Sequence, residues 1–212
     1  MDEVLSKIFV YLVIVFAAVF HEYGHGFMAY ELGDDTAKRH GRLTLNPLAH
    51  LDALGTVFIP LFLLFTSGTF IGWAKPVPYN PYFLRDKKYG SLKVALAGPL
   101  VNLAIALFLG LILRFSIGYS QSSPDRILEP MTELLSFVVY VNIFLALFNL
   151  LPVPPLDGSK IFIDLFPRQS AKIWRWFEGT GFFGIFLALF IAMFFLPTAA
   201  HYVFYFITGR TF

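Results

Sequence analysis

The stretch Val19-Phe20-His21-Glu22-Tyr23-Gly24-His25 decides the architecture of this chain, because it places three ionisable side chains in an apolar run whose residues 8–20 carry no charge. Residues at positions i and i+4 lie on one face of a helix, so His21 and His25 can reach the same Zn²⁺ ion. Glu22 then lies beside the metal, where a general base is needed. Ionisable groups at membrane depth are costly, and the stretch therefore indicates a functional site.

The composition is that of a protein embedded in a lipid bilayer. Of the 212 residues, 57% are hydrophobic and only 14% are charged, whereas a soluble domain carries about 25% charged residues. Several long apolar segments predict an all-α polytopic membrane protein with a single domain over residues 1–212. The net charge of +2 is small and no basic tail is present, so nucleic acid is not an expected partner. The chain has no cysteine, which excludes thiolate metal ligands.

Three long apolar segments predict the core helices of the fold. Residues 152–158 read Pro-Val-Pro-Pro-Leu-Asp-Gly and are expected to be non-helical, because each proline removes an amide donor and clashes with the preceding turn. Additional C-terminal helices are expected over residues 160–208, with a break at Pro197. The core helices are expected over residues 4–32, 91–117 and 131–151.

Two segments between the core helices are predicted to differ from plain spans. Residues 54–71 are apolar but are interrupted by Pro60 and by Thr66-Ser67-Gly68-Thr69, so this segment either crosses the membrane or re-enters it. Residues 72–81 are rich in proline and are expected to be extended at the membrane surface. A polar loop is expected over residues 118–130.

The basic residues favour re-entry of residues 54–71. Re-entry places the basic loop 34–51 on the same side as the basic loop 72–90 and residues 160–175, and it leaves few positive charges on the other side. The positive-inside rule prefers this arrangement. The prediction is that the N-terminus lies outside and that the metal site opens toward the cytosol. The residues on the side poor in positive charge are Lys7, Arg114 and Arg126.

A catalytic zinc site usually has three protein ligands, so a third is expected besides the two histidines. His40 and His50 lie in a charged loop and are predicted to be solvated, and His201 is predicted to be interfacial. Asp157 is the better candidate, because it lies in a segment that prolines unwind, and irregular backbone at membrane depth lines a protein or water cavity. The alternative for Asp157 is an Asp-Gly turn that caps the next helix.

Polar and small residues in the apolar helices are further candidates. Asn149 ends the helix before Asp157, and its amide could donate to a developing oxyanion. A helix C-cap or an interhelical hydrogen bond explains Asn149 equally well. Gly98, Pro99 and Asn102 are interpreted as residues that allow close packing against the helix that bears the histidines.

Three motifs together resemble the site-2 protease family, which consists of intramembrane zinc metalloproteases. The motifs are His21-Glu-Tyr-Gly-His25, Ala97-Gly-Pro-Leu-Val-Asn102 and Asn149-Leu-Leu-Pro-Val-Pro-Pro-Leu-Asp157-Gly158. The segments 46–52 and 72–78 look like the compact prokaryotic branch, which lacks a PDZ domain. The resemblance covers nearly the whole chain and implies a three-helix catalytic core.

The resemblance implies roles for particular residues. His21, His25 and Asp157 would bind one zinc ion, Glu22 would be the catalytic base, and Asn149 would assist. The substrate would be a transmembrane protein, and the site would lie in a prokaryotic plasma membrane. The extended residues 72–81 could hold the substrate by strand addition, or form a plain surface loop.

Two other functions use the same residues. A membrane metal-ion transporter or metal-handling protein could use His21, Glu22, His25 and Asp157 as a transit site. Transporters favour paired halves with internal symmetry, and the His-Glu-x-x-His pattern is not repeated in this sequence. A membrane scaffold without catalysis would not need Glu22.

Overall fold

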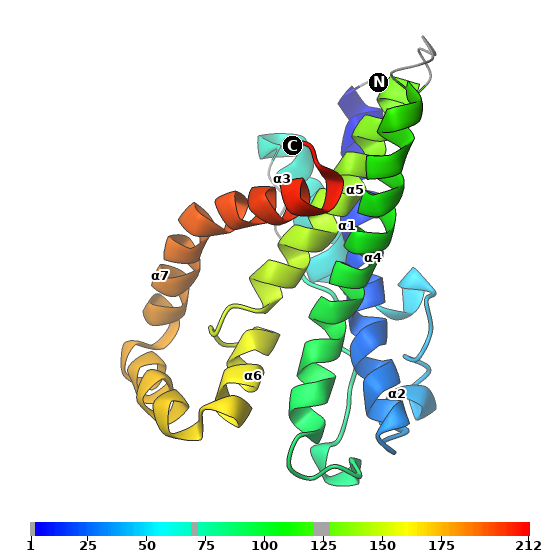
Figure 1. The fold of residues 1–212 in the computed structure, drawn as a ribbon. Helices are drawn as coiled ribbons and strands as arrows, with labels where there is room; N and C mark the ends of the chain where they lie inside the picture. The colour runs from blue at the N-terminus through cyan, green and yellow to red at the C-terminus, as the bar shows by residue number, and fades with distance from the viewer. Residues whose placement is uncertain (1–2, 69–71, 121–127) are drawn as a thin grey trace. The chain divides into compact units, whose positions relative to one another are not determined.

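The computed structural model of the chain describes residues 3–68, 72–120 and 128–212 (Figure 1). Regular secondary structure in these three ranges is helical and includes no strand. In this part of the chain, four helices are long and apolar enough to cross a membrane. The predicted all-α polytopic membrane protein is therefore confirmed. The four candidate spans are Glu3–Glu31, Gly90–Phe115, Pro130–Asn149 and Phe183–Thr208.

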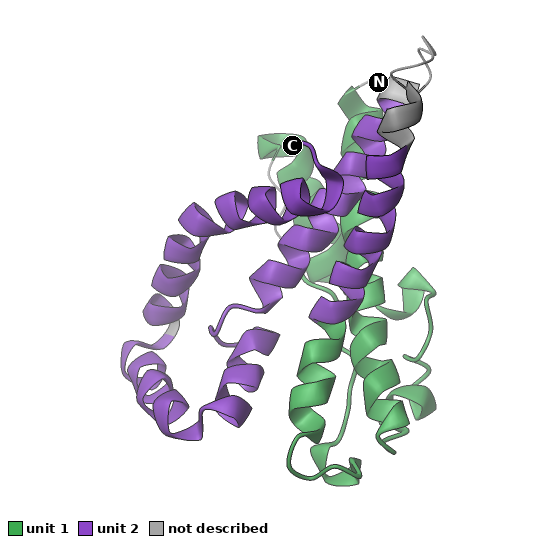
Figure 2. Ribbon diagram, viewed as in Figure 1, with its two compact units in different colours: residues 1–98 green, residues 99–212 purple. Residues whose placement is uncertain are grey.

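The chain divides into two compact units, residues 1–98 and residues 99–212 (Figure 2). Unit 1 contains α1 (Glu3–Glu31), α2 (Thr36–Arg39), α3 (Ile59–Ser67) and the first residues of α4 (Gly90–Ser120). Unit 2 contains the rest of α4, α5 (Leu128–Asn149), α6 (Asp157–Leu165) and α7 (Pro167–Thr208). The single domain expected from the sequence stays a prediction.

Helix α1 confirms the helix expected over residues 4–32, and a glycine ends it. Gly33 has a φ of 102°, and the N–H of Asp34 donates to the carbonyl of Ala29 at 2.9 Å, which is the bond of a Schellman motif. The buried Asp34 carboxylate then accepts from the backbone N–H groups of Thr36 at 3.0 Å and Asn80 at 2.5 Å. Asp34 thus holds the segment that ends at Asn80 against the end of α1.

The apolar segment after residue 52 is helical over Ala53–Ser67, and Pro60 does not interrupt it. The Asp52 carboxylate accepts from the N–H groups of Leu54 and Gly55 and begins a π-helical stretch, Ala53–Phe58. Pro60 lies in the first turn of α3, where a missing N–H is tolerated. Gly68, with a φ of 68°, ends the helix, and residues 69–71 lie outside the described ranges.

The length of Ala53–Ser67 bears on whether this segment crosses the membrane. This apolar helix is between 10 and 17 residues long, whereas a membrane span needs about 20 residues. The length favours re-entry, and the choice stays a prediction.

The start of α4 is set by Asp86. Its carboxylate accepts from the N–H groups of Lys88 and Tyr89 and pairs with the Lys93 ammonium at 2.8 Å. The hydrogen bond from Lys93 is the main reason why the pKa of Asp86 is lowered to about 2. Residues 72–80, before this turn, contain no helix. Residue 81 was also expected to be extended, but Pro81 begins a short 3₁₀ helix, Pro81–Phe83.

Helices α4 and α5 confirm the other two core helices, with shifted ends. Helix α4 continues through Pro99 to Ser120, and α5 begins at Leu128. The expected loop over residues 118–130 is therefore wrong at both ends, because residues 118–120 belong to α4 and residues 128–130 belong to α5. Residues 121–127 lie outside the described ranges. Inside unit 2, Asn102 of α4 donates to Asn142 of α5 at 2.9 Å, and both are buried.

Two expectations for the C-terminal third are wrong. Residues 157 and 158 are helical, because α6 begins at Asp157, two residues after Pro155, the last proline of the turn. Pro197 does not end a helix: α7 runs through it to Thr208, and the backbone departs from helical geometry at Gly181 instead. Buried residues beyond Pro197, including Ala200 and Phe204, pack into a core and stabilise the continued helix.

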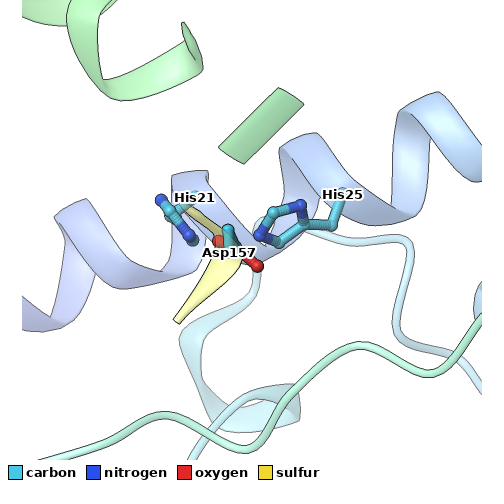
Figure 3. Close-up of side chains that lie close together, drawn as sticks. All are labelled: His21, His25 and Asp157. Atoms are coloured by element: carbon cyan, nitrogen blue, oxygen red, sulfur yellow. The ribbon is translucent and has the colours of Figure 1, made fainter. Parts of the chain in front are cut away.

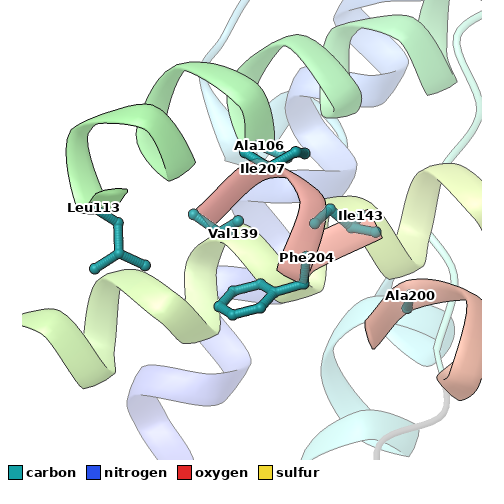
Figure 4. Packing of buried hydrophobic residues seen from close by; sticks show 7 residues of the cluster. All are labelled: Ala106, Leu113, Val139, Ile143, Ala200, Phe204 and Ile207. Carbon is teal, nitrogen blue, oxygen red and sulfur yellow. The ribbon is translucent and has the colours of Figure 1, made fainter. Parts of the chain in front are cut away.

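That core fills unit 2 where α4, α5 and the end of α7 meet (Figure 4). Gly110 allows α7 to approach, since a Cβ there would lie 2.5 Å from Ile207 Cγ2. Arg114 donates to the carbonyls of Phe206 and Ile207 at the end of α7. The buried members are Ala106, Leu113, Val139, Ile143, Ala200, Phe204 and Ile207.

The core makes a testable contrast between two phenylalanines of α7. Phe204 is 1% exposed and Phe206 is 83% exposed. Phe204→Ala should destabilise the protein by about 3 kcal/mol or more, because a buried ring leaves a cavity. Thermal unfolding in detergent should show a clearly lower unfolding temperature for Phe204→Ala and a small change for Phe206→Ala. An equal fall in unfolding temperature for the two variants would contradict this packing.

Candidate metal centre

His21 and His25 lie one turn apart on α1 and form the first part of the centre (Figure 3). Both are buried, with exposed fractions of 5% and 8%. Their ring centroids are 4.7 Å apart and the rings are nearly perpendicular. One ligand nitrogen of each lies within 4.8 Å of the other. The structure thus brings together the two histidines that the sequence pairs.

The orientation of His25 is fixed by the main chain of α4. Its Nδ1 lies 2.7 Å from the carbonyl oxygen of Val94. A carbonyl can only accept, so Nδ1 carries the proton and donates. A neutral ring with its proton on Nδ1 has its lone pair on Nε2, which is the arrangement of a histidine metal ligand with its second nitrogen hydrogen-bonded.

Gly98 shows where the two histidines point. A Cβ at this position would lie 2.5 Å from His25 Nε2 and 2.7 Å from His21 Nε2. The Nε2 atoms of both rings therefore face the same place beside the backbone of α4. Gly98 confirms the interpretation that a small residue allows close packing against the helix that bears the histidines. It also leaves the two Nε2 atoms room that any side chain would fill.

Glu22 is held by the non-helical segment of residues 72–80. Its Oε2 accepts from the backbone N–H of Val77 at 2.7 Å, and Val77 is 7% exposed. A carboxylate has two oxygens, and this bond fixes one of them. Glu22 is thus placed next to His21 with a defined orientation.

Asp157 belongs to unit 2 and is the third residue drawn in Figure 3. It is 6% exposed, is the first residue of α6, and pairs with the Lys160 ammonium at 3.2 Å. The N-cap residue of α6 is Leu156 and Asp157 lies inside the helix, so Asp157 is not the residue of a turn that precedes the helix. Gly158 is required here, since a Cβ would lie 2.2 Å from the carbonyl oxygen of Leu150.

The other candidates are placed as follows. His40 is exposed, as predicted. His50 is 1% exposed, so its predicted solvation is wrong. Its Nε2 donates to the carbonyl of Thr44 at 2.8 Å, which offsets part of the cost of burying the ring, whereas Nδ1 is buried without a hydrogen-bond partner among the described residues. His201 is exposed, and its interfacial position stays a prediction. The amide of Asn149 donates to the carbonyl of Leu145 in its own helix at 3.0 Å.

Sequence reasoning missed Val94 and Val77, which hold His25 and Glu22. Both act through backbone groups, and backbone groups leave no mark on residue identity. A weak signal existed for Val77, because Pro76 and Pro78 on either side carry no N–H.

The profile of peptidase family M50 matches residues 9–127 and 125–193. The chain belongs to peptidase family M50. This confirms the resemblance to the site-2 protease family. Membership in M50 makes the chain a zinc metalloprotease, and it speaks against the transporter alternative. No protein of known structure matches the chain.

Curated relatives agree with the M50 assignment. YwhC of Bacillus subtilis, named as a candidate zinc metalloprotease, is 39% identical over 85% of this chain and 80% of its own length. Rip2 of Mycolicibacterium smegmatis, named likewise, is 28% identical over 73% of this chain and 57% of its own length. A relative from Methanocaldococcus jannaschii, also so named, is 35% identical over 70% and 71%.

The geometry at Gly98 predicts that any side chain there impairs metal binding. Gly98→Ala should weaken zinc affinity by about 10- to 100-fold, because its Cβ displaces the rings of both histidines. Competition with a chelator on the purified protein measures the affinity. Gly179→Ala is the matched control, since a Cβ there meets nothing within 4 Å. Unchanged zinc affinity in Gly98→Ala would contradict the geometry.

Proposed function

We propose that the protein is an intramembrane protease that hydrolyses peptide bonds within or near transmembrane segments of membrane-protein substrates. The observation that carries the proposal is the burial of His21 and His25 in α1, a helix long and apolar enough to cross a membrane. A metal held by that helix meets peptide bonds at membrane depth.

We propose further that His21, His25 and Asp157 bind one zinc ion. Each residue offers one ligand atom and each is buried. Two imidazoles and a carboxylate are a donor set of catalytic zinc sites, which keep the fourth position for water. The tautomer of His25 and the space beside Gly98 support this assignment. When bound, zinc makes water acidic and polarises the scissile carbonyl.

Glu22 is proposed as the general base. Val77 fixes Oε2, so Oε1 is the oxygen assigned to the proton of the attacking water. The water oxygen forms a bond to the carbonyl carbon and the C–N bond breaks. Glu22 then delivers the proton to the leaving amine nitrogen. The amide of Asn149 has two N–H groups, and one of them donates within its helix. The second is proposed to donate to the oxyanion.

The substrate and the location follow from the same site. A transmembrane helix hides its carbonyl groups in intrahelical bonds, so the substrate must unwind locally before attack. The bilayer and a single transmembrane protein segment are therefore the proposed partners. We propose a plasma-membrane location with the N-terminus outside and the site open to the cytosol, supported by the basic loops and the short helix Ala53–Ser67.

The catalytic role of Glu22 is tested by Glu22→Gln. This variant should retain zinc, because the ligands are unchanged, and should cleave a single-span model substrate about 100- to 10,000-fold more slowly than the wild type. The measurements are metal content of the purified protein and cleavage in proteoliposomes. Full zinc content together with wild-type cleavage would rule out the proposal.

The orientation is tested by single cysteines in a chain that has none of its own. His40 and Lys87 are exposed, and cysteines there should resist an impermeant thiol reagent in intact cells but react after lysis. A cysteine at position 3 should react in intact cells and is the control. Labelling at position 40 or 87 from outside would reverse the topology.

A further inference from the structure

The backbone of residues 73–77 shows an alternating pattern of hydrogen bonds. The N–H of Trp73 donates to the carbonyl of Gly55 at 2.9 Å, and that of Lys75 to the carbonyl of His50 at 3.0 Å. The next amide in the pattern, Val77, donates to the Glu22 carboxylate at 2.7 Å. Successive amides of an extended chain point to opposite sides. One edge of this segment therefore presents three donors, and the last meets a side chain where the others meet main-chain carbonyls.

The sequence isolates this last donor. Val77 lies between Pro76 and Pro78, so its N–H is the one amide donor of the tripeptide. Pro78 also restricts Val77 to an extended backbone. A single donor in a stiff frame is suited to hold one partner in one geometry.

The frame is fastened on both sides of Val77. Before it, Lys75 bonds to His50, and after it, Asn80 donates to the buried Asp34 at 2.5 Å. The side chain of Val77 packs on α1 one turn after Glu22, since a Cβ on Gly26 would lie 3.0 Å from Val77 Cγ1. The position of the amide is thus set independently of the bond to Glu22.

We propose that Val77 is a positioning residue, whose backbone N–H holds Glu22 Oε2 so that Oε1 faces the water and the leaving amine. The proposal rests on the proposed role of Glu22 as general base. A glutamate side chain has several rotatable bonds, and a charge-assisted hydrogen bond restricts them. Misplacing a catalytic group by about 1 Å can cost about 100-fold in rate.

The first test replaces the amide of residue 77 by an ester, through incorporation of the α-hydroxy analogue of valine in the full chain. This change removes the N–H and keeps the side chain and the backbone geometry. The expected result is a fall in kcat of about 10- to 100-fold, with KM and zinc content unchanged. The same ester at Ala74, whose amide lies on the other edge, is the matched control and should retain wild-type kcat. Wild-type kcat for the ester at residue 77 would overturn the proposal.

A second test does not depend on activity. Thermal unfolding is measured for the wild type, Val77→Pro, Glu22→Ala and the double variant. If the N–H of residue 77 donates to Glu22, the double variant should lose less free energy of unfolding than the two single variants lose together. Purely additive losses of this free energy would overturn the proposal. If Val77→Pro does not fold, the ester variant replaces it in the cycle.

The two proposals fail in different ways. Wild-type cleavage by Glu22→Gln defeats the role of Glu22 as base, and the unfolding cycle still reports whether the bond exists. Loss of cleavage in Glu22→Gln together with wild-type kcat in the ester variant defeats the positioning role alone.

Discussion

Ionisable side chains on an apolar helix need polar partners close by, because leaving such groups without partners in a membrane costs several kcal/mol. Much of unit 1 can be understood from this constraint. The ring of His25 donates to the carbonyl of Val94, and the carboxylate of Glu22 accepts from the amide of Val77. The first turns of α4 and the extended residues 72–80 must therefore lie against α1. Asp34, at the end of α1, holds the same extended segment at a second point.

Close approach of backbones is the second requirement, and small residues meet it. Gly98 brings α4 next to the histidines, and Gly26 brings Val77 next to α1. In unit 2, Gly110 does the same for the end of α7, and the buried pair Asn102–Asn142 joins α4 to α5. Apolar side chains gain nothing by leaving lipid for one another, so close packing and interhelical hydrogen bonds decide how such helices associate.

The sequence was informative where local chemistry decides the structure. The apolar length of α1, its end at Gly33 and the pairing of His21 with His25 follow from periodicity and from glycine geometry. The three core helices and the family could also be predicted, whereas the number of crossings in the C-terminal part was left open. Prolines were less informative: Pro197 was expected to end a helix, but burial of residues beyond it offsets the lost hydrogen bond.

Other features depend on tertiary contacts that a linear pattern does not carry. His50 was expected in solvent, yet its ring is buried against the carbonyl of Thr44. The start of α6 at Asp157 depends on Gly158 fitting against the carbonyl oxygen of Leu150. Val94 and Val77 could not be assigned from sequence, because any residue with a backbone carbonyl or amide could supply the same bond.

The use of main-chain groups around His25 and Glu22 has an evolutionary consequence. A side-chain partner is lost when its residue is replaced by one without the same polar group, whereas a carbonyl at position 94 survives every substitution and an amide at position 77 survives every substitution except proline. Sequences that drift at these two positions can keep the same polar contacts as long as they keep apolar bulk. The backbone contacts to His25 and Glu22 therefore tolerate most substitutions at positions 94 and 77. Selection against substitutions is expected to fall on the histidines and the glutamate themselves.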